Sequence, residues 1–567
     1  MLQQQQVRDL PQVIAQLINK REISNVEDYL SWDLKKLPLL TDLKDLAKGA
    51  SRLIEAINNK ETIAVYGDYD VDGTTSCALL WHFFKMIGIE VECIQPSRFI
   101  EGYGIHAPTI DEAIEKGIKV LITVDCGITN NETADYAMEK GIDLIITDHH
   151  KDARDEMPQA FAVINPNRRD EDLDSPLTAL AGVGVAFALA LEIKNQLARA
   201  NVQTPSIYPL LQLVAVGTIC DLAKLNPMNL KLCRHGLKQI PGSQYPGIRA
   251  FFTPEERELS FMPSEKISFG VGPLINSKGR LDHPKEALNL LTSNDSDDAF
   301  RSYSILHSSN TERKFIQSEV YKEAIAEIND SGETDQMINI VYQPHWHEGV
   351  IGIVASKLVE TYRVPAMVFT DASEEGIIKA SIRSAGELNI FNLLQESSDL
   401  FIKFGGHKAA AGLSMPKDNL QMLKENANKF LSNIPEILRT KQDTVDLEIK
   451  PEEVTPNLVK TLEMLEPFGM GNEKPIFKMS GIKLESYDLM KDVHVRWNFT
   501  GIKNSKIKLK GLSFNYIGAH GKIHPEDIYN QQSEGSNELT IFFTLGINRW
   551  KGREYIQLMI EKITLLP

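Results

Sequence analysis

Residues 62–73, TIAVYGDYDVDG, join an apolar run to three alternating carboxylates. The first half is rich in β-branched and apolar residues and ends at Gly67, which predicts a buried strand followed by a turn. Helical stretches separate four further runs of this kind: VECIQP (91–96), KVLITVD (119–125), DLIITD (143–148) and AFAVINP (160–166). This alternation predicts an α/β fold with a doubly wound parallel sheet, whose site lies at the carboxyl ends of the strands.

The three carboxylates of the first run, Asp68, Asp70 and Asp72, repel one another unless a cation holds them together. The pattern D-x-D-x-D-G also begins the calcium loop of an EF-hand. Position twelve of that loop would be Leu79, where a bidentate Glu is required, so the sequence disfavours a calcium loop. A solvated acidic turn is the remaining alternative for this segment taken alone.

Further strand ends supply residues that ligate metals. The third and fourth runs and the apolar stretch LLQLVAVGTICDLAKL contribute Asp125, Asp148, His149, His150 and Asp221. Oxygen and imidazole ligands without thiolates favour Mn²⁺ or Mg²⁺ over structural zinc. They are too many for one octahedral ion, whereas two ions about 3.5–4 Å apart would activate water and stabilise in-line displacement at phosphorus. The sequence therefore predicts metal-dependent phosphoester hydrolysis.

Composition sets outer limits on this interpretation. The chain has 567 residues, of which 42% are hydrophobic and 24% charged, so we expect several globular domains. Its net charge of -16 argues against non-specific coating of nucleic acid, although a local basic groove remains compatible with it. The five cysteines form no CxxC pair, which favours a reducing cytoplasm. We expect neither a secretion signal nor a membrane span, because the uncharged stretch 175–191 is shorter than about 20 residues.

The chain divides by pattern into five parts. Residues between Lys285 and Ser331 lack Pro and Gly, and Ile316, Val320 and Ala324 recur at a spacing of four, which predicts a long helix from about Asp297 to Asn329. The last part alternates in the period-two manner of half-exposed strands. We therefore expect an N-terminal helical segment (1–60), a catalytic domain (61–285), a connecting helix (286–330), a smaller α/β domain (331–441) and an all-β module resembling an oligonucleotide-binding (OB) fold (442–567).

The motifs themselves resemble a known family. GDYDVDG, VDCG, TDHH and GTICD are similar to the four successive motifs of the DHH phosphoesterase family. Five later segments resemble the RecJ branch of that family, which comprises exonucleases specific for single-stranded DNA: RFIEGYG (98–104), VGPLINSKGRLD (271–282), HEGVIGIVASKL (347–358), SIRS (381–384) and FGGHKAAAGLSM (404–415). The resemblance runs in order over nearly the whole chain and identifies the smaller α/β part as a DHH-associated (DHHA1-like) domain.

The resemblance implies roles for individual residues of the first domain. It assigns metal ligation to Asp70, Asp72, Asp125, His149 and Asp221, and it places Asp68 in or next to the ligand shell. Asp125 would bridge the two ions, and His150 would face the scissile phosphate. Together with Arg280, these two residues are the expected catalytic groups. Tyr66 stands where smaller relatives have a histidine, which leaves open whether one ion is held more weakly.

The resemblance also implies residues that contact phosphate or DNA. Ser381, Arg383 and His407 of the second domain would grip phosphate together with Arg98, and Arg offers a bidentate fork for this purpose. Asn276 and Arg280 would contact the nucleic-acid backbone or cap a helix, and Tyr103 would stack on a base or anchor its loop.

The last module contains an alternating basic segment. Arg496 lies on one run, and Lys506, Lys508 and Lys510 alternate with Ile507 and Leu509 on the next, so three ammonium groups would project from one strand face. The preceding run also carries Trp497 and Phe499, which would place aromatic material beside a basic face. This pattern suits a module that tracks single-stranded DNA. A solvated charged face is the alternative.

The resulting functional hypothesis is a cytoplasmic, monomeric 5′-to-3′ exonuclease that degrades single-stranded DNA to mononucleotides with two Mn²⁺ or Mg²⁺ ions. Direction, strand preference and a role in DNA repair and recombination come from the resemblance. So do the expected partners, namely a single-strand-binding protein, a helicase and recombination mediators. One alternative is a small-substrate phosphoesterase acting on short oligonucleotides, cyclic dinucleotides or pyrophosphate. Another is a non-catalytic scaffold, which the complete ligand set disfavours.

Overall fold

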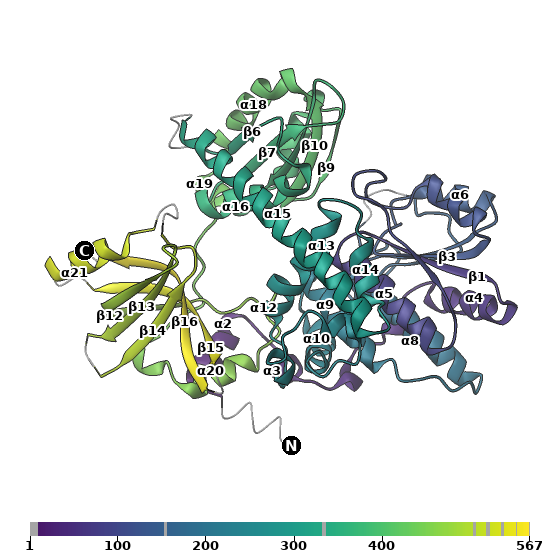
Figure 1. Cartoon of the computed structure of the whole chain (residues 1–567), viewed down its shortest axis with the longest axis horizontal. Coiled ribbons are helices and arrows are strands. Elements are labelled where there is room, and N and C mark those ends of the chain that lie inside the picture. The colour runs from purple at the N-terminus through teal and green to yellow at the C-terminus, as the bar shows by residue number, and fades with distance from the viewer. Residues whose placement is uncertain are drawn as a thin grey trace. The chain divides into compact units, whose positions relative to one another are not determined.

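A computed structural model describes residues 10–151, 156–330, 336–502, 506–517, 522–534, 538–550 and 553–565. The chain forms two compact units (Figure 1). The first unit comprises Ile18–Asn310 and Thr461–Lys474. The second comprises Thr311–Lys460 and Pro475–Pro567, with the short stretch Gln12–Leu17. No helix within the described ranges has both the length and the apolar character needed to cross a membrane.

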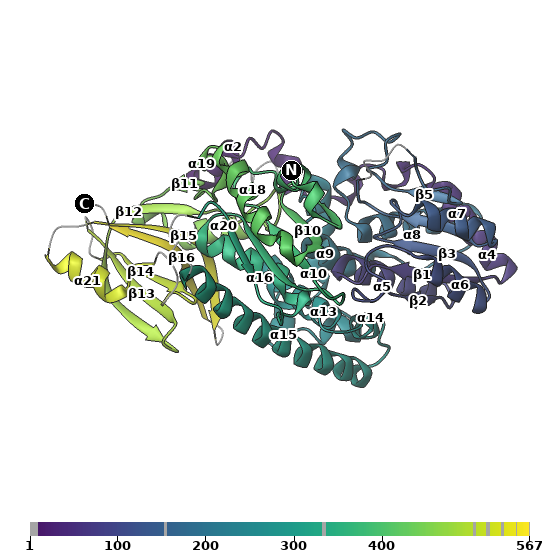
Figure 2. The same ribbon diagram turned by 90° about the horizontal axis from the view of Figure 1, so that it is seen from above.

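The first unit is built on a five-stranded parallel sheet, which confirms the predicted α/β class (Figure 2). The strand order is β2-β1-β3-β4-β5. All but the short β2 are almost wholly buried, as expected for β-branched runs that are covered on both faces. The strands are β1 (Thr62–Gly67), β2 (Glu92–Ile94), β3 (Ile118–Val124), β4 (Asp143–Thr147) and β5 (Ala162–Ile164).

Helices cover both faces of this sheet, as a doubly wound fold requires. Helices α6 (Ala107–Glu115) and α7 (Asn131–Glu139) enclose one core with the sheet. Helices α4 (Leu46–Asn59), α5 (Val71–Met86) and α8 (Gly182–Arg199) pack against one another and against the sheet.

The predicted N-terminal segment 1–60 therefore does not stand apart from the catalytic domain. A Cβ atom on Gly49 of α4 would lie 3.1 Å from Ile164 of β5, so this helix is part of the layer that covers the sheet. The sequence pattern did not reveal this role, because it depends on contact with β5, which lies far along the chain.

The strand order places a topological switch point between β1 and β3. The crossovers leave the sheet in opposite directions there, so the carboxyl ends of these two strands flank an open crevice. The first carboxylate motif follows β1 and Asp125 follows β3.

Short helices complete the first unit around α9, which ends at the predicted ligand Asp221. Their bounds are α3 (Val26–Leu30), η1 (Leu34–Lys36), η2 (Leu40–Asp42), η3 (Pro176–Ala179), η4 (Tyr208–Leu210), α9 (Leu211–Cys220), α10 (Pro227–Gln239), α11 (Pro246–Arg249), η5 (Glu256–Glu258), α12 (Ser264–Lys266), the π-helical turn η6 (Ile267–Val271), α13 (Gly272–Gly279) and α14 (Lys285–Leu291). A further helix, α2, spans Gln12–Lys20.

The predicted long helix is α15 (Ser296–Asp330), within one residue of the expected bounds at each end. Val320, Ala324 and Ile328 are buried against α16 (Glu348–Tyr362), which confirms the predicted apolar stripe. The expected connecting segment 286–330 is nevertheless two helices, because α14 ends at Leu291 and packs with α13 and α5 of the first unit.

The second unit contains a mixed sheet of order β6-β7-β8-β10-β9, in which only β6 and β7 are parallel. Its core lies between the sheet and helices α17 and α18. The elements are β6 (Asn339–Tyr342), β7 (Ala366–Asp371), β8 (Ile377–Arg383), α17 (Ile390–Glu396), η7 (Ser398–Leu400), β9 (Lys403–Gly406), β10 (Ala410–Pro416), η8 (Lys417–Asn419), α18 (Leu420–Ser432) and α19 (Glu436–Arg439).

The C-terminal strands close into a five-stranded barrel of order β12-β13-β14-β16-β15, with β15 pairing back to β12. This order, with α21 between the third and fourth barrel strands, confirms the predicted OB-like fold. The elements are β11 (Leu447–Glu448), η9 (Pro451–Glu453), α20 (Pro456–Glu463), β12 (Phe477–Met490), β13 (His494–Gly501), β14 (Lys508–Ser513), α21 (Pro525–Glu534), β15 (Leu539–Trp550) and β16 (Arg553–Leu565).

One stretch of the predicted module 442–567 belongs to the first unit instead. Residues 461–474 pack beside α10, where the fully buried guanidinium of Arg234 donates to the carbonyl oxygens of Glu466, Tyr29 and Ser31. Asn472 accepts a 2.6 Å hydrogen bond from the Tyr29 hydroxyl. These contacts are between residues more than 200 positions apart, so the local sequence pattern could not reveal them.

We expect Arg234→Met to destabilise the first unit, because it leaves three carbonyl oxygens without their buried donor. The loss should be about 3 kcal/mol or more in the free energy of unfolding. Arg301→Met is the matched control, since Arg301 pairs with Asp298 at a largely exposed position and should cost less than about 1 kcal/mol. Urea unfolding followed by tryptophan fluorescence measures both. Equal losses in the two variants would contradict the anchoring role of Arg234.

Candidate metal centre

The first carboxylate motif is held by backbone donors. Asp70 caps α5 and accepts a 3.0 Å hydrogen bond from the Gly73 amide. Asp72 is completely buried, and its two oxygens accept from the amides of Gly182 and Val183 at 2.6 and 2.9 Å. These amides begin α8, whose positive dipole end favours the carboxylate. The solvated acidic turn is therefore ruled out.

The ends of β3 and β4 meet this motif. Asp125 has a left-handed backbone (φ 61°), and its amide donates to the Thr147 carbonyl oxygen across the sheet. His149 Nε2 lies 3.1 Å from Asp125 Oδ1, and both atoms are buried without a hydrogen-bond partner. A Cβ atom on Gly182 would lie 2.7 Å from Asp125 Cβ, so a glycine is needed here for the close approach. A carboxylate oxygen and an imidazole nitrogen that lie this close without hydrogen-bond partners are typical of a metal-ion site.

Asp221 completes the cluster from α9. As the C-terminal cap of that helix, it brings Oδ2 to 3.9 Å from His149 Nε2, and Asp72 Oδ2 lies 3.8 Å from the same nitrogen. A Cβ atom on Gly217 would lie 2.8 Å from Asp72 Oδ1, so this glycine lets α9 approach α5.

The cluster contains two adjacent sets of possible ligands. Asp68, Asp70 and Asp125 form one set, and Asp72, His149 and Asp221 form the other, with the ligand atoms of each set within 4.8 Å of one another. A third set joins His150 to Asp125 and His149. All six predicted metal ligands thus come together, and the orphaned atom Asp68 Oδ1 is a further indication that a cation fits here.

Asp148, which the strand-end pattern grouped with the possible metal ligands, positions the histidines instead. Its Oδ1 accepts from the amides of His149 and His150 and contacts His150 Nδ1 at 2.8 Å, while Oδ2 accepts from the Ile128 amide. The side-chain amides of Asn165 and Asn167 donate to the carbonyl oxygens of His150 and His149. Only the adjacency of Asp148 to two histidines could have signalled this role.

Burial shifts the pKa values of the cluster. It raises the pKa of Asp72 to about 7 and that of Asp221 to about 9, with the neighbouring carboxylates adding to both shifts. Burial lowers the pKa of His149 to about 4. Burial also opposes the charged form of His150, but the hydrogen bond and the charge of Asp148 outweigh it and raise the pKa of His150 to about 9. Without a cation, the cluster therefore retains protons at neutral pH.

The loop after β2 brings Arg98 and Tyr103 to the cluster. The Arg98 guanidinium lies 4.4 Å above the Tyr69 ring, and the Tyr103 hydroxyl is 2.9 Å from His150 Nδ1. Tyr66, about which the sequence left a question, is buried in the core beside α6 and α7 and donates to the Gly104 carbonyl oxygen. It anchors the loop that carries Tyr103.

Asn276 and Arg280 lie at the end of α13, both half-buried. Arg280 is the C-terminal cap of the helix, where a cation complements the dipole. A Cβ atom on the adjacent Gly279 would lie 3.6 Å from the Tyr69 carbonyl oxygen, so this helix end lies against the first carboxylate motif. The catalytic and DNA-binding roles of the two residues stay predictions.

The predicted phosphate residues of the second unit lie on β8 and in the β9–β10 turn. Arg383 donates to the Ser381 hydroxyl at 3.1 Å, and both side chains lie close to Gly352 of α16. Burial lowers the pKa of Arg383. His407 is exposed in the turn. Gly406 precedes it with φ 150°, where a Cβ atom would lie only 2.5 Å from the Ala410 carbonyl oxygen.

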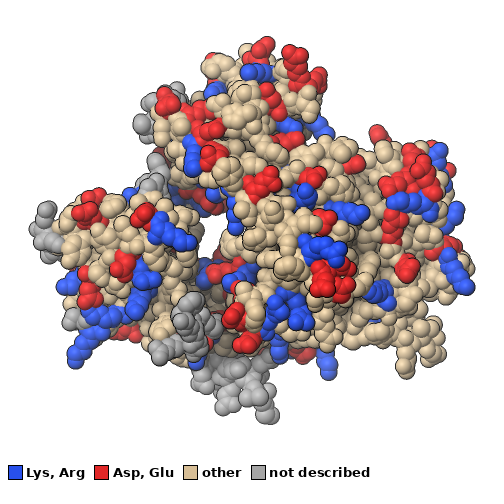
Figure 3. Space-filling view, viewed as in Figure 1, with Lys and Arg blue, Asp and Glu red and all other residues tan. Residues whose placement is uncertain are grey.

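The barrel presents part of the predicted basic face. Lys508 and Lys510 are exposed on β14, and Arg496 is exposed on the neighbouring β13. Basic side chains are visible on this part of the molecule in Figure 3. Lys506 precedes β14, so only two of the three lysines project from the strand. The aromatic part of the prediction was wrong, because Trp497 and Phe499 point into the barrel core and cannot stack on bases.

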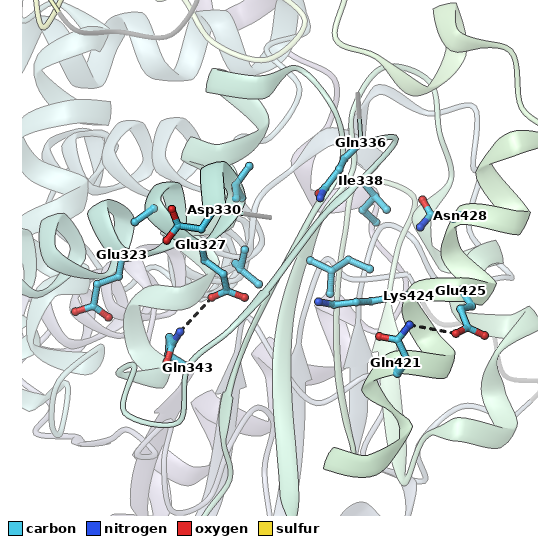
Figure 4. A pocket seen from close by; sticks show the side chains of 14 residues that line it. Glu323, Glu327, Asp330, Gln336, Ile338, Gln343, Gln421, Lys424, Glu425 and Asn428 are labelled. Carbon is cyan, nitrogen blue, oxygen red and sulfur yellow. Dashed lines mark hydrogen bonds between the residues drawn. The ribbon is translucent and has the colours of Figure 1, made fainter. Parts of the chain in front are cut away.

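A pocket of about 800 Å³ lies elsewhere in the second unit, between α15, β6 and α18 (Figure 4). Glu323, Glu327 and Asp330 face it from α15, and Lys424 and Glu425 from α18. Gln343 donates to Glu327 at one side of the pocket. None of the predicted site residues lines it, and its carboxylates do not suit a polyanion.

Comparison with known proteins places these elements in one family. Three family descriptions match in order: "DHH family, N-terminal domain" over residues 62–218, "DHHA1 domain" over 335–433 and "RecJ OB domain" over 445–562. The single-stranded-DNA-specific exonuclease RecJ of Dickeya dadantii is 30% identical, over 98% of this chain and 96% of that protein. The chain belongs to the RecJ family.

Other RecJ proteins are similar to this chain in sequence or in structure. RecJ of Bacillus subtilis is 32% identical over 92% of this chain, which spans 63% of that longer relative. The crystal structure of RecJ from Thermus thermophilus in complex with Mn²⁺ matches with a TM-score of 0.75 and 26% identity, over 93% of this chain and 72% of that one. A crystal structure of exonuclease RecJ bound to manganese matches with a TM-score of 0.59 and 30% identity, over 71% of this chain and 98% of that one.

The metal-free protein should lose stability as the pH rises from about 6.5 to 9. Asp221 and His150 keep protons in the folded state that the unfolded chain has already released in this range, so folding becomes less favourable as they ionise. Mn²⁺ should raise the melting temperature at pH 8 and flatten this dependence, because it binds the ionised ligands of the folded state. Thermal unfolding with EDTA or Mn²⁺ measures both effects.

Two variants control this prediction. Asp125→Asn should abolish the shift caused by Mn²⁺, whereas Asp135→Asn, at an exposed position on α7, should retain it. An equal shift in both would contradict the assignment of Asp125 as a shared ligand.

Proposed function

We propose that this chain is a metal-dependent exonuclease that degrades single-stranded DNA from the 5′ end and releases mononucleotides. One observation carries the chemistry: two sets of three ligands lie side by side at the switch point of a doubly wound sheet. Relatives named single-stranded-DNA-specific exonuclease RecJ support the substrate class. The direction of degradation, from the 5′ end, and the release of mononucleotides follow from the family resemblance.

The donor set fits two Mn²⁺ or Mg²⁺ ions. Asp68, Asp70 and Asp125 would hold one, and Asp72, His149 and Asp221 the other. Asp125, whose Oδ1 lies 3.1 Å from His149 Nε2, would contribute to both sets. A bound pair of such ions supplies an activated water and stabilises the charge that develops at phosphorus. Oxygen and imidazole donors without a thiolate suit these cations.

The surrounding residues orient this chemistry. Asp148 holds His150 by its Nδ1, which leaves the opposite ring nitrogen to meet a phosphate oxygen. The Tyr103 hydroxyl, 2.9 Å from the same Nδ1, restricts rotation of the ring. We assign His150 the role of contacting the scissile phosphate, and Asn276 and Arg280 that of binding the backbone beside it.

Phosphate groups of the strand are bound by arginines of both units in this proposal. Arg98 has a buried Nε atom without a hydrogen-bond partner, so it retains a donor for an anion. Ser381 and Arg383 already share a hydrogen bond, which fixes the guanidinium plane for bidentate contact. His407, exposed in its glycine-rich turn, adds a further donor.

The proposed cellular setting is DNA repair and recombination in the cytoplasm, with the chain acting as a monomer. The five free cysteines suit a reducing compartment. A single-strand-binding protein, a helicase and recombination mediators are the partners we propose.

Digestion of end-labelled oligonucleotides tests this function. With Mn²⁺ or Mg²⁺, we expect mononucleotides to be released from the 5′ end of single strands only, and EDTA should stop the reaction. Asp125→Ala should lower turnover by about a thousand-fold or more, because both ions depend on this carboxylate, while binding of single strands stays measurable. Asp135→Ala, on the surface of α7, should behave as the wild type.

Other outcomes would contradict the proposal in distinct ways. Hydrolysis of pyrophosphate or a cyclic dinucleotide without cleavage of long strands would move the chain to the small-substrate phosphoesterases. Binding of single strands without any hydrolysis would make it a scaffold. Unchanged turnover by Asp125→Ala would overturn the site assignment.

The barrel's role is tested by charge reversal. Deleting the whole module would also remove the partners of Arg234, so point variants are the better probe. Lys508→Glu with Lys510→Glu should weaken binding of a long single strand by about ten-fold or more at moderate salt. The slope of log K against log salt should fall by about 1.4, as expected for two lost phosphate contacts on a single strand.

A matched pair elsewhere in the second unit controls for net charge. Lys429→Glu with Lys460→Glu makes the same charge change at two exposed positions on α18 and α20. Affinity, measured by fluorescence anisotropy, should stay near that of the wild type. Equal losses in both pairs would show that β14 does not contact the strand.

A further inference from the structure

Two large apolar side chains beside the metal centre are exposed to water. Phe269 of the π-helical turn η6 is 80% exposed, and Leu222, which directly follows the ligand Asp221, is 61% exposed. Single exposed apolar residues are common on protein surfaces. These two differ because Leu222 directly follows the predicted ligand Asp221 and the turn that carries Phe269 packs on Cys220, which precedes it.

Contacts at Cys220 fix the position of η6. The Cys220 thiol contacts the Ile267 carbonyl oxygen at 3.8 Å, and a Cβ atom on Gly272 would lie 2.8 Å from the same sulfur. Both ends of the π-turn are thus packed on the residue that precedes Asp221. Phe269 lies in the middle of this turn, two residues after Ile267. Its backbone is therefore within about one helical turn of the contact between Ile267 and Cys220.

Leu222 is held on the other side of the ligand. Its backbone adopts the left-handed region (φ 59°), which a leucine enters only at a cost in energy. The amides of Leu222 and Ala223 donate to the carbonyl oxygens of Ile219 and Thr218, which stabilises this conformation. The chain therefore maintains an exposed leucine next to a metal ligand.

The space around Phe269 is open. A Cβ atom on the adjacent Gly270 would meet no atom within 4 Å, so a flat group can approach the ring from this side. π-helical turns occur frequently at functional sites, where they displace a side chain from the regular helical position. Here the displaced side chain is an aromatic ring, whose face can stack on any nucleobase.

We propose that Phe269 stacks on a base of the single strand bound at the metal centre, with Leu222 as an apolar contact for the adjacent sugar or base. This inference rests on the proposed function and deepens it by naming a base-contacting residue. A base accepts such stacking only when a neighbouring base does not cover its face, so the contact favours an unstacked strand. It requires no particular sequence, because every base offers a π-face.

Three variants test the role of Phe269. Phe269→Ala should weaken binding of a single strand by about ten-fold, and Phe269→Trp, which keeps an aromatic face, should restore it. Phe300→Ala is the control, since Phe300 is an equally large side chain, 69% exposed on α15 of the same unit. Anisotropy in EDTA gives the affinity. With Mn²⁺, KM should rise for Phe269→Ala while kcat changes little.

An abasic scan makes the test independent of folding defects. An abasic residue is moved along the strand, one position at a time, and its effect is measured with the wild type and with Phe269→Ala. We expect one position at which the missing base weakens binding to the wild type about ten-fold but has no further effect on the variant. This non-additivity would identify the stacked base.

The outcomes separate this inference from the proposed function. If the wild type binds and degrades single strands but Phe269→Ala behaves as Phe300→Ala does, the inference is overturned and the function stands. If abasic effects are the same in the wild type and in Phe269→Ala at every position, the inference is likewise overturned. A wild type that neither binds nor degrades single strands would overturn both.

Discussion

The close approach of buried carboxylates at one strand crossover is the constraint on which the rest of the first unit depends. Asp68, Asp72 and Asp125 are almost completely excluded from water, where an isolated charge is strongly disfavoured. The fold offsets part of this cost with oriented backbone dipoles, as where the first amides of α8 bind Asp72. The remainder requires protons or cations, and the buried atoms of Asp125 and His149 that have no hydrogen-bond partner fit a cation.

Much of the surrounding structure keeps these ligands in place. Gly182 and Gly217 lack side chains where helices α8 and α9 approach the carboxylates, and each position would clash with a ligand if it carried a Cβ atom. Asp148 accepts from the amides of both histidines and holds the His150 ring by its Nδ1, so the His150 ring has little freedom to rotate. Rigid ligands suit two-metal chemistry, because the ions must be held close together while the substrate changes shape.

The residues proposed to contact nucleic acid are held differently from those of the metal centre. Lys510 is exposed on the barrel, and Lys508 pairs with Glu485 at the barrel surface, whereas Arg383 is held by a neighbouring serine. Every nucleotide offers a phosphate group and the face of a base. A strand bound through these groups can therefore move along the protein whatever its base sequence. Residues 461–474, which precede the barrel strands in the sequence, belong to the first unit and accept a hydrogen bond from Arg234 there.

The sequence by itself determined the parallel sheet, the long helix, the barrel and the six residues that meet in the carboxylate–histidine cluster. The sheet, the helix and the barrel depend on local pattern, namely β-branched runs, a spacing of four in α15 and alternation in β12 to β16. The cluster residues stand in short motifs that resemble those of a known family. Tertiary structure alone decided that α4 covers the sheet, that Trp497 and Phe499 fill the barrel core, and that Asp148 positions His150. These outcomes depend on which distant backbone atoms and side chains a residue meets, and a one-dimensional pattern carries no information about such long-range packing.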